Sequence, residues 1–466
     1  MERAWLHAFL EFGSFPMEQP EGITQDRFEC KANSALYVVC TPHTLPEAEK
    51  RYPMVNQQRL QEHLVRLSQI GRLESGGIHR SSLSPEDSQA RALVGSWLEA
   101  AGFTLREDGA RNLVASLPGT LENAEVLMLG SHIDTVPNGG AFDGALGVLG
   151  GLEAVQSALE DGYVFRHPVE LVIFCDEEGA ERLGCLGSTL MFEDLAPEVL
   201  AGKAPGREQT VSERLGSMGL DTKRASREKR NPHDILAYLE LHIEQGGVLE
   251  SEELEIGVVQ GIVGIRRYEW QISGKANHAG TTPMHLRDDA LVKAARLIGE
   301  LNTLASRKEH LVATVGHLTL EPNAVNVIPG LVKFSEEVRS MYPKLIDELH
   351  ASFVDTASSI PGASMRDTSA SPPIWLSEPV RNVIADNAAN ANMKFKHMVS
   401  GAGHDAAAFA VAGVPTGMIF VPSIGGVSHA PHEFTPYEFC AKGSDLLRRT
   451  LLTLDQLDSL HVKCTP

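Results

Sequence analysis

The stretch GSHIDTVPNGGAFDGALG, residues 130–147, places His132, Asp134 and Asp143 among glycines. A histidine close to a carboxylate can form a hydrogen-bonded pair, a proton relay or half of a metal site. Glycines let the backbone curl, so Asp143 can approach a group that is held by His132. The stretch alone does not choose among these three kinds of site, and its partners elsewhere in the chain must decide.

Similar polar residues follow other apolar runs, at Glu177 and Glu178, His242 and Glu244, and His429 and His432. Each one alone is most simply a hydrogen-bonded or solvated residue, but their recurrence indicates a single site. Histidine nitrogens mixed with carboxylate oxygens suit Zn, Mn, Co or Ni rather than Ca or Mg alone. An aspartate such as Asp143 can bridge two metal ions that share one water. Of two adjacent glutamates, one can bind metal while its neighbour accepts a proton.

The composition limits the class of partner. The chain has 466 residues, with 41 Lys and Arg against 61 Asp and Glu, which gives a formal net charge of −20. So much negative charge argues against nucleic acid or a membrane surface as the main partner, but it allows a small anionic substrate. Six scattered cysteines without a CxxC pair indicate reduced thiols. No membrane span or signal peptide is recognised, so a cytoplasmic protein is expected.

Short apolar runs alternate with a helical pattern in much of the chain. Strands are expected at 125–132, 169–179, 236–246 and 414–423, with a helix over 149–159 between the first two. Nearly continuous apolar strands separated by helices predict an α/β fold with a mainly parallel sheet that is covered on both faces. Sites in such sheets form beyond the carboxyl ends of the strands, where the polar residues named above fall.

The middle of the chain has a different pattern. RYEWQIS (267–273) and LVKFSEEVRS (331–340) alternate like strands with one exposed face, and 290–301 reads as an amphipathic helix. This predicts a smaller α+β domain inserted into the first. The expected divisions are an irregular N-terminal extension, two parts of the catalytic domain and the insertion between them: 1–53, 54–261, 373–466 and 262–372.

Seven collinear motifs together resemble one known superfamily: GSHIDTVPNGGAFDGALG, DEEG…LGS, ELHIEQG, GKANHAGTTPM, EPNAVNVIPG, SGAGHDAAAF and PSIGGVSHAPHE. The chain resembles the M20 metallopeptidases, and within them the amidohydrolase branch of N-carbamoyl-L-amino-acid hydrolases, β-ureidopropionases and allantoate amidohydrolases. The resemblance covers roughly residues 56–455. It implies a catalytic domain with two metal ions and an inserted lid and dimerisation domain, and therefore a homodimer.

The resemblance also implies roles for individual residues. His132 and His242 would bind one divalent metal ion, Glu178 and His429 the other, and Asp143 would bridge the two. The ions would be Zn, Mn, Co or Ni. His432 is a weaker candidate, because the family pattern puts the ligand at the histidine after GGVS.

The remaining catalytic roles follow from the same motifs. Glu177 would be the general base and Asp134 the residue that orients His132. His278 would stabilise the oxyanion and, as often in this superfamily, would do so in the site of a neighbouring subunit.

Four further residues would contact the substrate. Gln245 matches a substrate-contacting glutamine, Asn326 and Arg339 match a pair that grips the substrate carboxylate, and His404 matches another site position. By strand alternation Arg339 is not a core residue. Without the resemblance, it could be read as a solvated surface arginine.

Two departures from the family pattern bear on specificity. Glu337 stands where the family usually has aspartate, and the run DEEGAERLGCLGS is about a residue shorter and lacks an Arg-Phe pair. Neither change affects a proposed metal ligand.

The sequence thus predicts a metal-dependent hydrolase of the ureido C–N bond of an N-carbamoyl amino acid or related ureido acid, releasing ammonia and carbon dioxide. Alternatives are an allantoate amidohydrolase, an M20 aminoacylase or peptidase, and a non-catalytic binding protein on the same fold. The last should have lost ligands or the base, whereas this chain keeps them.

Overall fold

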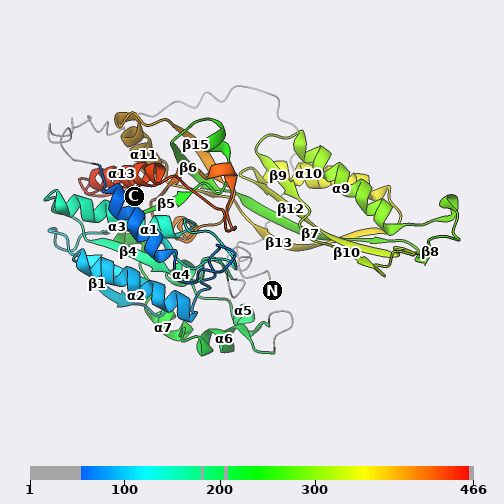
Figure 1. Ribbon diagram of the computed structural model, residues 1–466, viewed down its shortest axis with the longest axis horizontal. Coiled ribbons are helices and arrows are strands. Elements are labelled where there is room, and N and C mark those ends of the chain that lie inside the picture. The colour runs from blue at the N-terminus through cyan, green and yellow to red at the C-terminus, as the bar shows by residue number, and fades with distance from the viewer. Residues whose placement is uncertain (1–53, 180–182, 204–207, 461–466) are drawn as a thin grey trace, which may run out of the picture.

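The computed structural model describes residues 54–179, 183–203 and 208–460. The expected N-terminal extension, 1–53, and part of the shortened DEEG…LGS run lie outside these residues. A larger domain carries both described ends of the chain, and a smaller, elongated domain extends from one side of it (Figure 1).

The larger domain is built on a nine-stranded sheet in the order β1-β2-β4-β3-β5-β16-β6-β14, with β15 paired to β6. Four neighbouring pairs are parallel: β3 with β4, β3 with β5, β5 with β16, and β6 with β15. This confirms the predicted α/β class and its largely parallel sheet. The strands are β1 (Thr104–Glu107), β2 (Leu113–Leu117), β3 (Val126–His132), β4 (Val169–Phe174), β5 (Ile235–Ile243), β6 (Ile256–Ile262), β14 (Ile374–Trp375), β15 (Phe395–Ser400) and β16 (Thr416–Val421).

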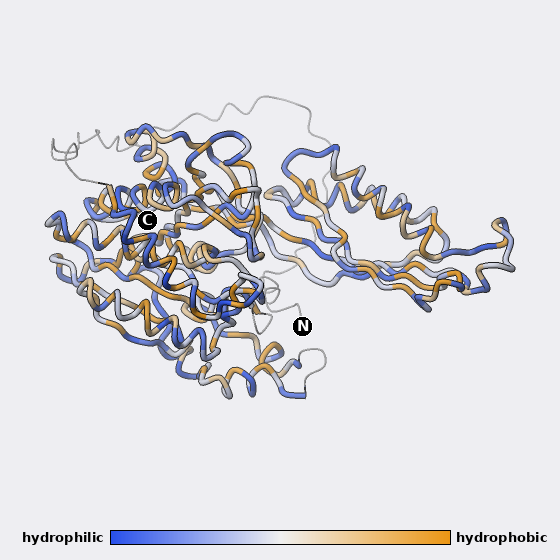
Figure 2. Tube along the Cα trace, in the orientation of Figure 1, coloured by the Kyte–Doolittle hydropathy of each residue, from blue (hydrophilic) through white to orange (hydrophobic). Residues whose placement is uncertain are grey.

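Helices cover both faces of this sheet, which explains why its central strands are apolar throughout. All nine residues of β5 are buried. Leu239 and Leu241 belong to one core cluster with the helices α1, α3, α11 and α13, while Tyr238 belongs to another with α12. Figure 2 shows hydrophobic segments running through the strands. The helices are α1 (Gln57–Leu67), α2 (Pro85–Ala100), α3 (Ala145–Glu160), α11 (Glu378–Asn390), α12 (Ala406–Val411) and α13 (Tyr437–Leu454).

Short helices form the rest of the larger domain. Four of them follow β4 and enclose a small apolar cluster around Leu215. A fifth follows β5. They are α4 (Leu186–Leu190), α5 (Pro197–Ala201), α6 (Val211–Ser217), α7 (Thr222–Arg227) and α8 (Val248–Ser251).

The smaller domain has a five-stranded antiparallel sheet in the order β10-β12-β7-β13, with β9 also paired to β12. The helices α9 and α10 pack against it on one face (Figure 1). A separate two-stranded ladder, β8 with β11, lies at the end remote from the larger domain. The elements are β7 (Gly264–Ser273), β8 (Asn277–His278), α9 (Ala290–Ser306), β9 (Leu311–Thr314), β10 (Leu318–Glu321), β11 (Val327–Ile328), β12 (Leu331–Ser340), α10 (Pro343–Ser358) and β13 (Ala363–Ser371).

Strand β12 shows the alternation that its sequence predicted. Val332, Phe334 and Val338 are buried in the core of the smaller domain, whereas Glu337 and Arg339 lie on the other face and are partly exposed. The period of two places these polar side chains on the face that is not covered by α9 and α10.

Two further observations concern the chain as a whole. Among the described residues, no helix is both long and apolar enough to cross a membrane. The described cysteines Cys175, Cys185 and Cys440 are buried and free.

The core of the smaller domain generates a stability prediction. Phe353 on α10 is fully buried, and its ring lies 4.9 Å from that of Trp270 in an edge-to-face arrangement. We expect Phe353→Ala to lower the free energy of unfolding of this domain by about 3–5 kcal/mol, because it removes a large buried ring and leaves a cavity. Denaturant unfolding measures the loss. Val354→Ala is the matched control, since Val354 is 36% exposed and its truncation should change the stability little. Equal effects of the two substitutions would contradict the packing described.

Candidate metal centre and active site

Three parallel strands deliver polar residues to one edge of the larger sheet. His132 is the last residue of β3 and pairs with Phe174, the last residue of β4. Glu177 and Glu178 are the third and fourth residues after the end of β4, and His242 lies at the end of β5. The side chains converge because the carboxyl ends of parallel strands meet at the same edge.

Asp143 lies between two groups of these side chains. Its Oδ1 is 3.2 Å from Nε2 of His242 and 3.8 Å from Nε2 of His132. Its Oδ2 is 3.3 Å from Nε2 of His429, which in turn is 3.5 Å from Oε2 of Glu178. The structure therefore brings the five predicted ligands together in the predicted grouping, with the two oxygens of one carboxylate facing different histidines.

Hydrogen bonds to the backbone orient two of the imidazole rings. Nδ1 of His132 is 3.0 Å from the carbonyl oxygen of Asp134, and Nδ1 of His242 is 2.9 Å from that of Ile243. The carbonyl oxygen accepts the hydrogen bond from Nδ1–H, so Nε2 is the ring nitrogen that faces Asp143 and can bind a metal ion once it carries no proton. Both rings are buried. This is the geometry expected of metal-binding histidines.

The charges at this edge also suit bound cations. Burial, followed by repulsion from Asp143, raises the pKa of Glu178 to about 7. Burial lowers the pKa of His132 to about 4. Burial opposes protonation of His242, yet its bond to Asp143 raises its pKa to about 9. Among the described residues, no Lys or Arg side chain is bonded to Asp143, Glu177 or Glu178. Burying several carboxylates together in this way is costly unless a positive charge joins them. The donor set of imidazoles and carboxylates fits divalent metal ions.

Glu177 lies at the margin of this group. One carboxylate oxygen, Oε2, is 3.5 Å from Nε2 of His132, and the other accepts a weak hydrogen bond from the thiol of Cys185 at 3.6 Å. Burial, together with the charges of Asp405 and Glu178, raises its pKa well above the usual value. A raised pKa makes a carboxylate a better proton acceptor, as a general base requires.

Asp134 differs in detail from its expected role. Its carboxylate Oδ1 is 3.7 Å from Nδ1 of His132, farther than its own backbone carbonyl, which makes the hydrogen bond. The other oxygen, Oδ2, accepts a bond from the backbone N–H of Glu178 at 3.3 Å. In this structure the backbone of Asp134 orients His132, and its side chain bonds the segment that carries the paired glutamates.

Comparison with known proteins places this arrangement in a family. The family model for peptidase family M20/M25/M40 matches residues 128–453. The chain belongs to this family. Over 411 residues it is 39% identical to an N-carbamoyl-L-amino acid amidohydrolase of Geobacillus stearothermophilus, covering 86% of this chain and 100% of the relative. It is 34% identical to an allantoate amidohydrolase of Bacillus subtilis over 80% of this chain and 92% of the relative.

A solved structure agrees with these relatives. A hydantoinase/carbamoylase-family amidase of Burkholderia multivorans is 32% identical, with a TM-score of 0.76, and the match covers 86% of this chain and 98% of that one. The resemblance read from the motifs is thus confirmed, and with it the prediction that the protein is an M20-family hydrolase.

Two of the predicted substrate residues lie beside the metal centre. Nε2 of Gln245 donates to Oδ2 of Asp143 at 2.8 Å. The ring of His404 is buried edge-to-face on that of His242, 4.5 Å between centroids, and its Nε2 lies 2.8 Å from the hydroxyl of Ser400. Each of the two residues therefore contacts a proposed metal ligand, Gln245 contacting Asp143 and His404 contacting His242.

Arg339 extends from the smaller domain toward the larger one. Its Nη1 donates to the carbonyl oxygen of Gly401 at 2.6 Å, and its Nε donates to Glu337 at 2.7 Å. Glu337 also forms a 2.6 Å ion pair with Arg267 on the neighbouring strand. Glu337, which stands where the family usually has aspartate, thus uses one donor of the Arg339 guanidinium and is also paired with Arg267.

His278 and Asn326 are not brought to the metal centre of their own chain. His278 is in β8 and Asn326 directly precedes β11, both exposed at the remote end of the smaller domain (Figure 1). Strand β12, which runs from this end to Arg339, spans about 30 Å at 3.3 Å per residue. Asn326 and Arg339 of one chain therefore do not form the predicted pair around a small carboxylate.

Sequence reasoning missed two residues that hold Asp143. Oε1 of Glu433 accepts the backbone N–H groups of Phe142 and Asp143 at 2.9 and 3.1 Å. The hydroxyl of Ser428 contacts both Oε2 of Glu433 and Oδ2 of Asp143 at 2.9 Å. Both residues lie in the motif PSIGGVSHAPHE, and their place in this motif was the feature of the sequence that could have identified them. His432, the weaker candidate, is exposed and belongs to none of the ligand groups found among the described residues.

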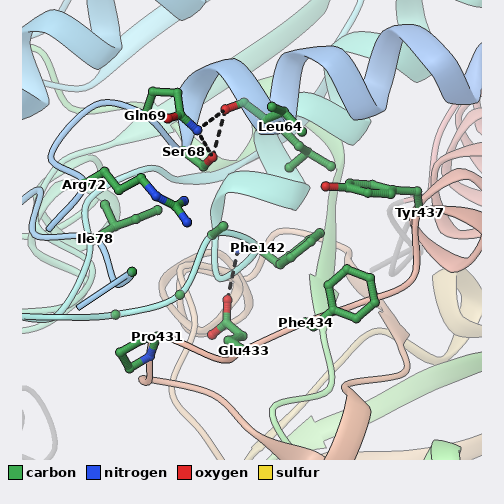
Figure 3. A pocket seen from close by; sticks show the side chains of 15 residues that line it. Leu64, Ser68, Gln69, Arg72, Ile78, Phe142, Pro431, Glu433, Phe434 and Tyr437 are labelled. Atoms are coloured by element: carbon green, nitrogen blue, oxygen red, sulfur yellow. Dashed lines mark hydrogen bonds between the residues drawn. The ribbon is translucent and has the colours of Figure 1, made fainter. Parts of the chain in front are cut away.

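A cavity of about 440 Å³ lies behind the loop of Asp143. Phe142, Glu433, Phe434 and Tyr437 line it together with residues of α1, and no predicted metal ligand does (Figure 3). Glu433 therefore separates this cavity from the metal centre.

Gly144 carries the second prediction. Its φ is +62°, and a Cβ built there would overlap the imidazole of His132. We expect Gly144→Ala to sharply reduce metal binding, measured by elemental analysis, because the methyl group takes the space in front of Nε2. Gly162→Ala is the control, since φ is +80° there and a Cβ would meet no atom within 4 Å. Metal content unchanged in Gly144→Ala would contradict the geometry of the site.

Proposed function

We propose that this protein hydrolyses the ureido C–N bond of an N-carbamoyl amino acid or a related ureido acid with the help of two divalent metal ions, Zn, Mn, Co or Ni. The observation that carries the proposal is the position of Asp143 between two histidine and carboxylate groups, with Glu177 beside them. The relatives support the substrate class, since several are N-carbamoyl-L-amino-acid amidohydrolases at 34–39% identity.

The contacts of the site residues support the roles proposed for them. His132 and His242 would hold one ion, Glu178 and His429 the other, with Asp143 shared. Bound divalent ions polarise a carbonyl group and lower the pKa of water.

Glu177 takes a proton from the attacking water, which forms a bond to the carbamoyl carbon. The bond between the carbamoyl carbon and the nitrogen of the amino acid then breaks, and Glu177 returns the proton to that nitrogen as it leaves. The amino acid is released together with carbamic acid, which decomposes to ammonia and carbon dioxide.

The substrate would lie between the metal centre and the smaller domain. Gln245 and His404 border the candidate metal centre, and Arg339 on β12 donates to Gly401, three residues before His404. A guanidinium can donate two parallel hydrogen bonds to a carboxylate, so Arg339 suits the carboxylate of an amino acid. Glu337 accepts hydrogen bonds from both Arg339 and Arg267, and its bond to Arg339 restricts how far that guanidinium can turn toward the substrate.

A homodimer completes this site. His278 and Asn326 lie at the far end of the smaller domain, so they can act on a substrate only in the site of a second chain (Figure 1). The smaller domain would then be both lid and dimerisation domain. We expect the dimer in the cytoplasm, where the free thiols would stay reduced.

Allantoate is the second candidate substrate, because a relative with this activity in its name is 34% identical. It carries the same ureido group, so the site chemistry does not separate the two. An aminoacylase or peptidase activity is the next alternative within the family. The presence of all five ligands and of Glu177 argues against a non-catalytic binding protein.

A substrate panel tests the proposal. We expect ammonia release from N-carbamoyl-L-amino acids, 3-ureidopropionate or allantoate, loss of this activity on chelation, and recovery with Mn, Co, Ni or Zn. Glu177→Gln should keep its metal and lose about 10²–10⁴-fold in turnover, because an amide accepts no proton from water. Glu178→Gln should instead lose metal. Activity confined to N-acetyl amino acids or dipeptides would refute the proposal, and full activity without metal would refute its chemistry.

Mixed dimers test the shared site. Arg339→Met and His278→Ala should each lower kcat/KM, by roughly 30-fold or more for Arg339, since breaking a buried charged pair costs about 2–5 kcal/mol. Co-expression of the two variants should restore activity, because one site of the mixed dimer then has an intact Arg339 and an intact partner His278. His278→Ala mixed with Asn326→Ala is the control and should restore none. A fully active monomer in sedimentation would refute the shared site.

A further inference from the structure

Glu240 lies among the histidines of the metal centre without a role in the reaction proposed above. It is on β5, two residues before His242, and is 1% exposed. Because side chains alternate along a strand, both point to the same face of the sheet. Ligand-type atoms of Glu240, His242 and His404 all lie within 4.8 Å of one another. Burying an acid this deeply costs free energy unless hydrogen bonds or a positive charge compensate it.

The carboxylate is bonded to three segments of the chain. The hydroxyl of Ser131 donates to its Oε1 at 2.9 Å, and the backbone N–H of Ala406 donates to its Oε2 at 2.9 Å. The hydroxyl of Tyr238 is 3.2 Å from the same Oε2. Ser131 directly precedes His132 on β3, and Ala406 begins α12 two residues after His404. One carboxylate thus joins the ends of β3, β5 and the start of α12.

We propose that Glu240 is a positioning residue that holds His132 and His242 at the separation that one of the two metal ions requires. The inference rests on the proposed function, because it concerns the metal pair named there. The two oxygens of a carboxylate group offer about four lone-pair sites to donors, so such a group suits a point where donors from several segments meet. Partners of this kind typically change metal affinity by about 10–100-fold when they are mutated.

The contacts predict that the effect is confined to one metal ion. Glu240 is bonded next to His132 and lies on the strand of His242, which share one ion in the proposal. Glu178 and His429 are assigned to the other ion, and among the described residues their segments make no hydrogen bond to Glu240. A purely structural acid would instead lower the stability of the domain and weaken both ions alike.

Calorimetric titration of the metal-free full-length protein with Mn²⁺ or Co²⁺ tests this. We expect two binding events in the unmodified protein. In Glu240→Gln, one should weaken by about 10–100-fold and the other should stay unchanged, because the amide matches the volume but turns a donor toward a donor. The control is Glu153→Gln. Glu153 is also 1% exposed, and its carboxylate accepts hydrogen bonds from Arg59 and Ser157. Neither of these partners is a proposed metal ligand or adjoins one in the sequence. It should lower Tm and leave both binding events unchanged.

A milder variant covers the case in which Glu240→Gln fails to fold. Ser131→Ala removes one donor and keeps the carboxylate, and it should weaken the same single event to a smaller extent. Equal weakening of both events, or no weakening, in the folded variants would overturn the role of Glu240. If the unmodified protein itself binds no pair of metal ions, the proposed function fails first, so the two failures are distinguishable.

Discussion

The carboxylate of Asp143 has to face two groups of side chains at once, His132 with His242 and Glu178 with His429, and much of the larger domain serves this requirement. Gly144 has a positive φ and no Cβ, which leaves room for the imidazole of His132 next to it. Gln245 and Ser428 donate to Oδ2, and Glu433 takes the backbone N–H of Asp143 itself. These contacts come from distant parts of the chain, so the position of one oxygen pair depends on the whole sheet.

Holding so many acids together has an energetic cost. Burial and mutual repulsion raise the pKa values of Glu177, Glu178 and Glu433. Without cations, these groups favour protonation or separation, and both oppose the compact arrangement. Divalent ions that bind the folded site would stabilise it by mass action. Metal binding and the stability of this edge of the sheet are therefore linked through the same carboxylates.

The smaller domain sets the distance between the proposed substrate-binding residues that it carries. One face of its sheet is packed by α9 and α10, and the other is free to present polar side chains. Arg339 is near the larger domain, whereas His278 and Asn326 are a strand length away. A rigid sheet keeps these groups apart in one chain, and the same rigidity would bring them accurately to the site of a second chain.

Local patterns in the sequence determined a large part of this protein. Apolar strands with polar ends predicted the parallel sheet and the edge where His132, Glu177 and His242 meet, because alternation and strand termini are properties of neighbouring residues. The period of two in β12 predicted the outward position of Arg339. The roles of the ligands came from the resemblance of whole motifs, since residue types alone left a hydrogen-bonded pair, a relay and a metal site open.

Tertiary structure alone decided how these residues are held and which of them can meet. The bond between Glu433 and the N–H of Asp143 joins positions 290 residues apart, and that between Ser131 and Glu240 joins positions 109 apart. The backbone carbonyl of Asp134, at 3.0 Å, is the partner of His132 rather than its carboxylate, at 3.7 Å, and this small difference depends on how the two side chains are packed. The separation of Asn326 from Arg339 depends on the direction of a strand. Such facts arise from the packing of distant segments, and no local pattern of residues records them.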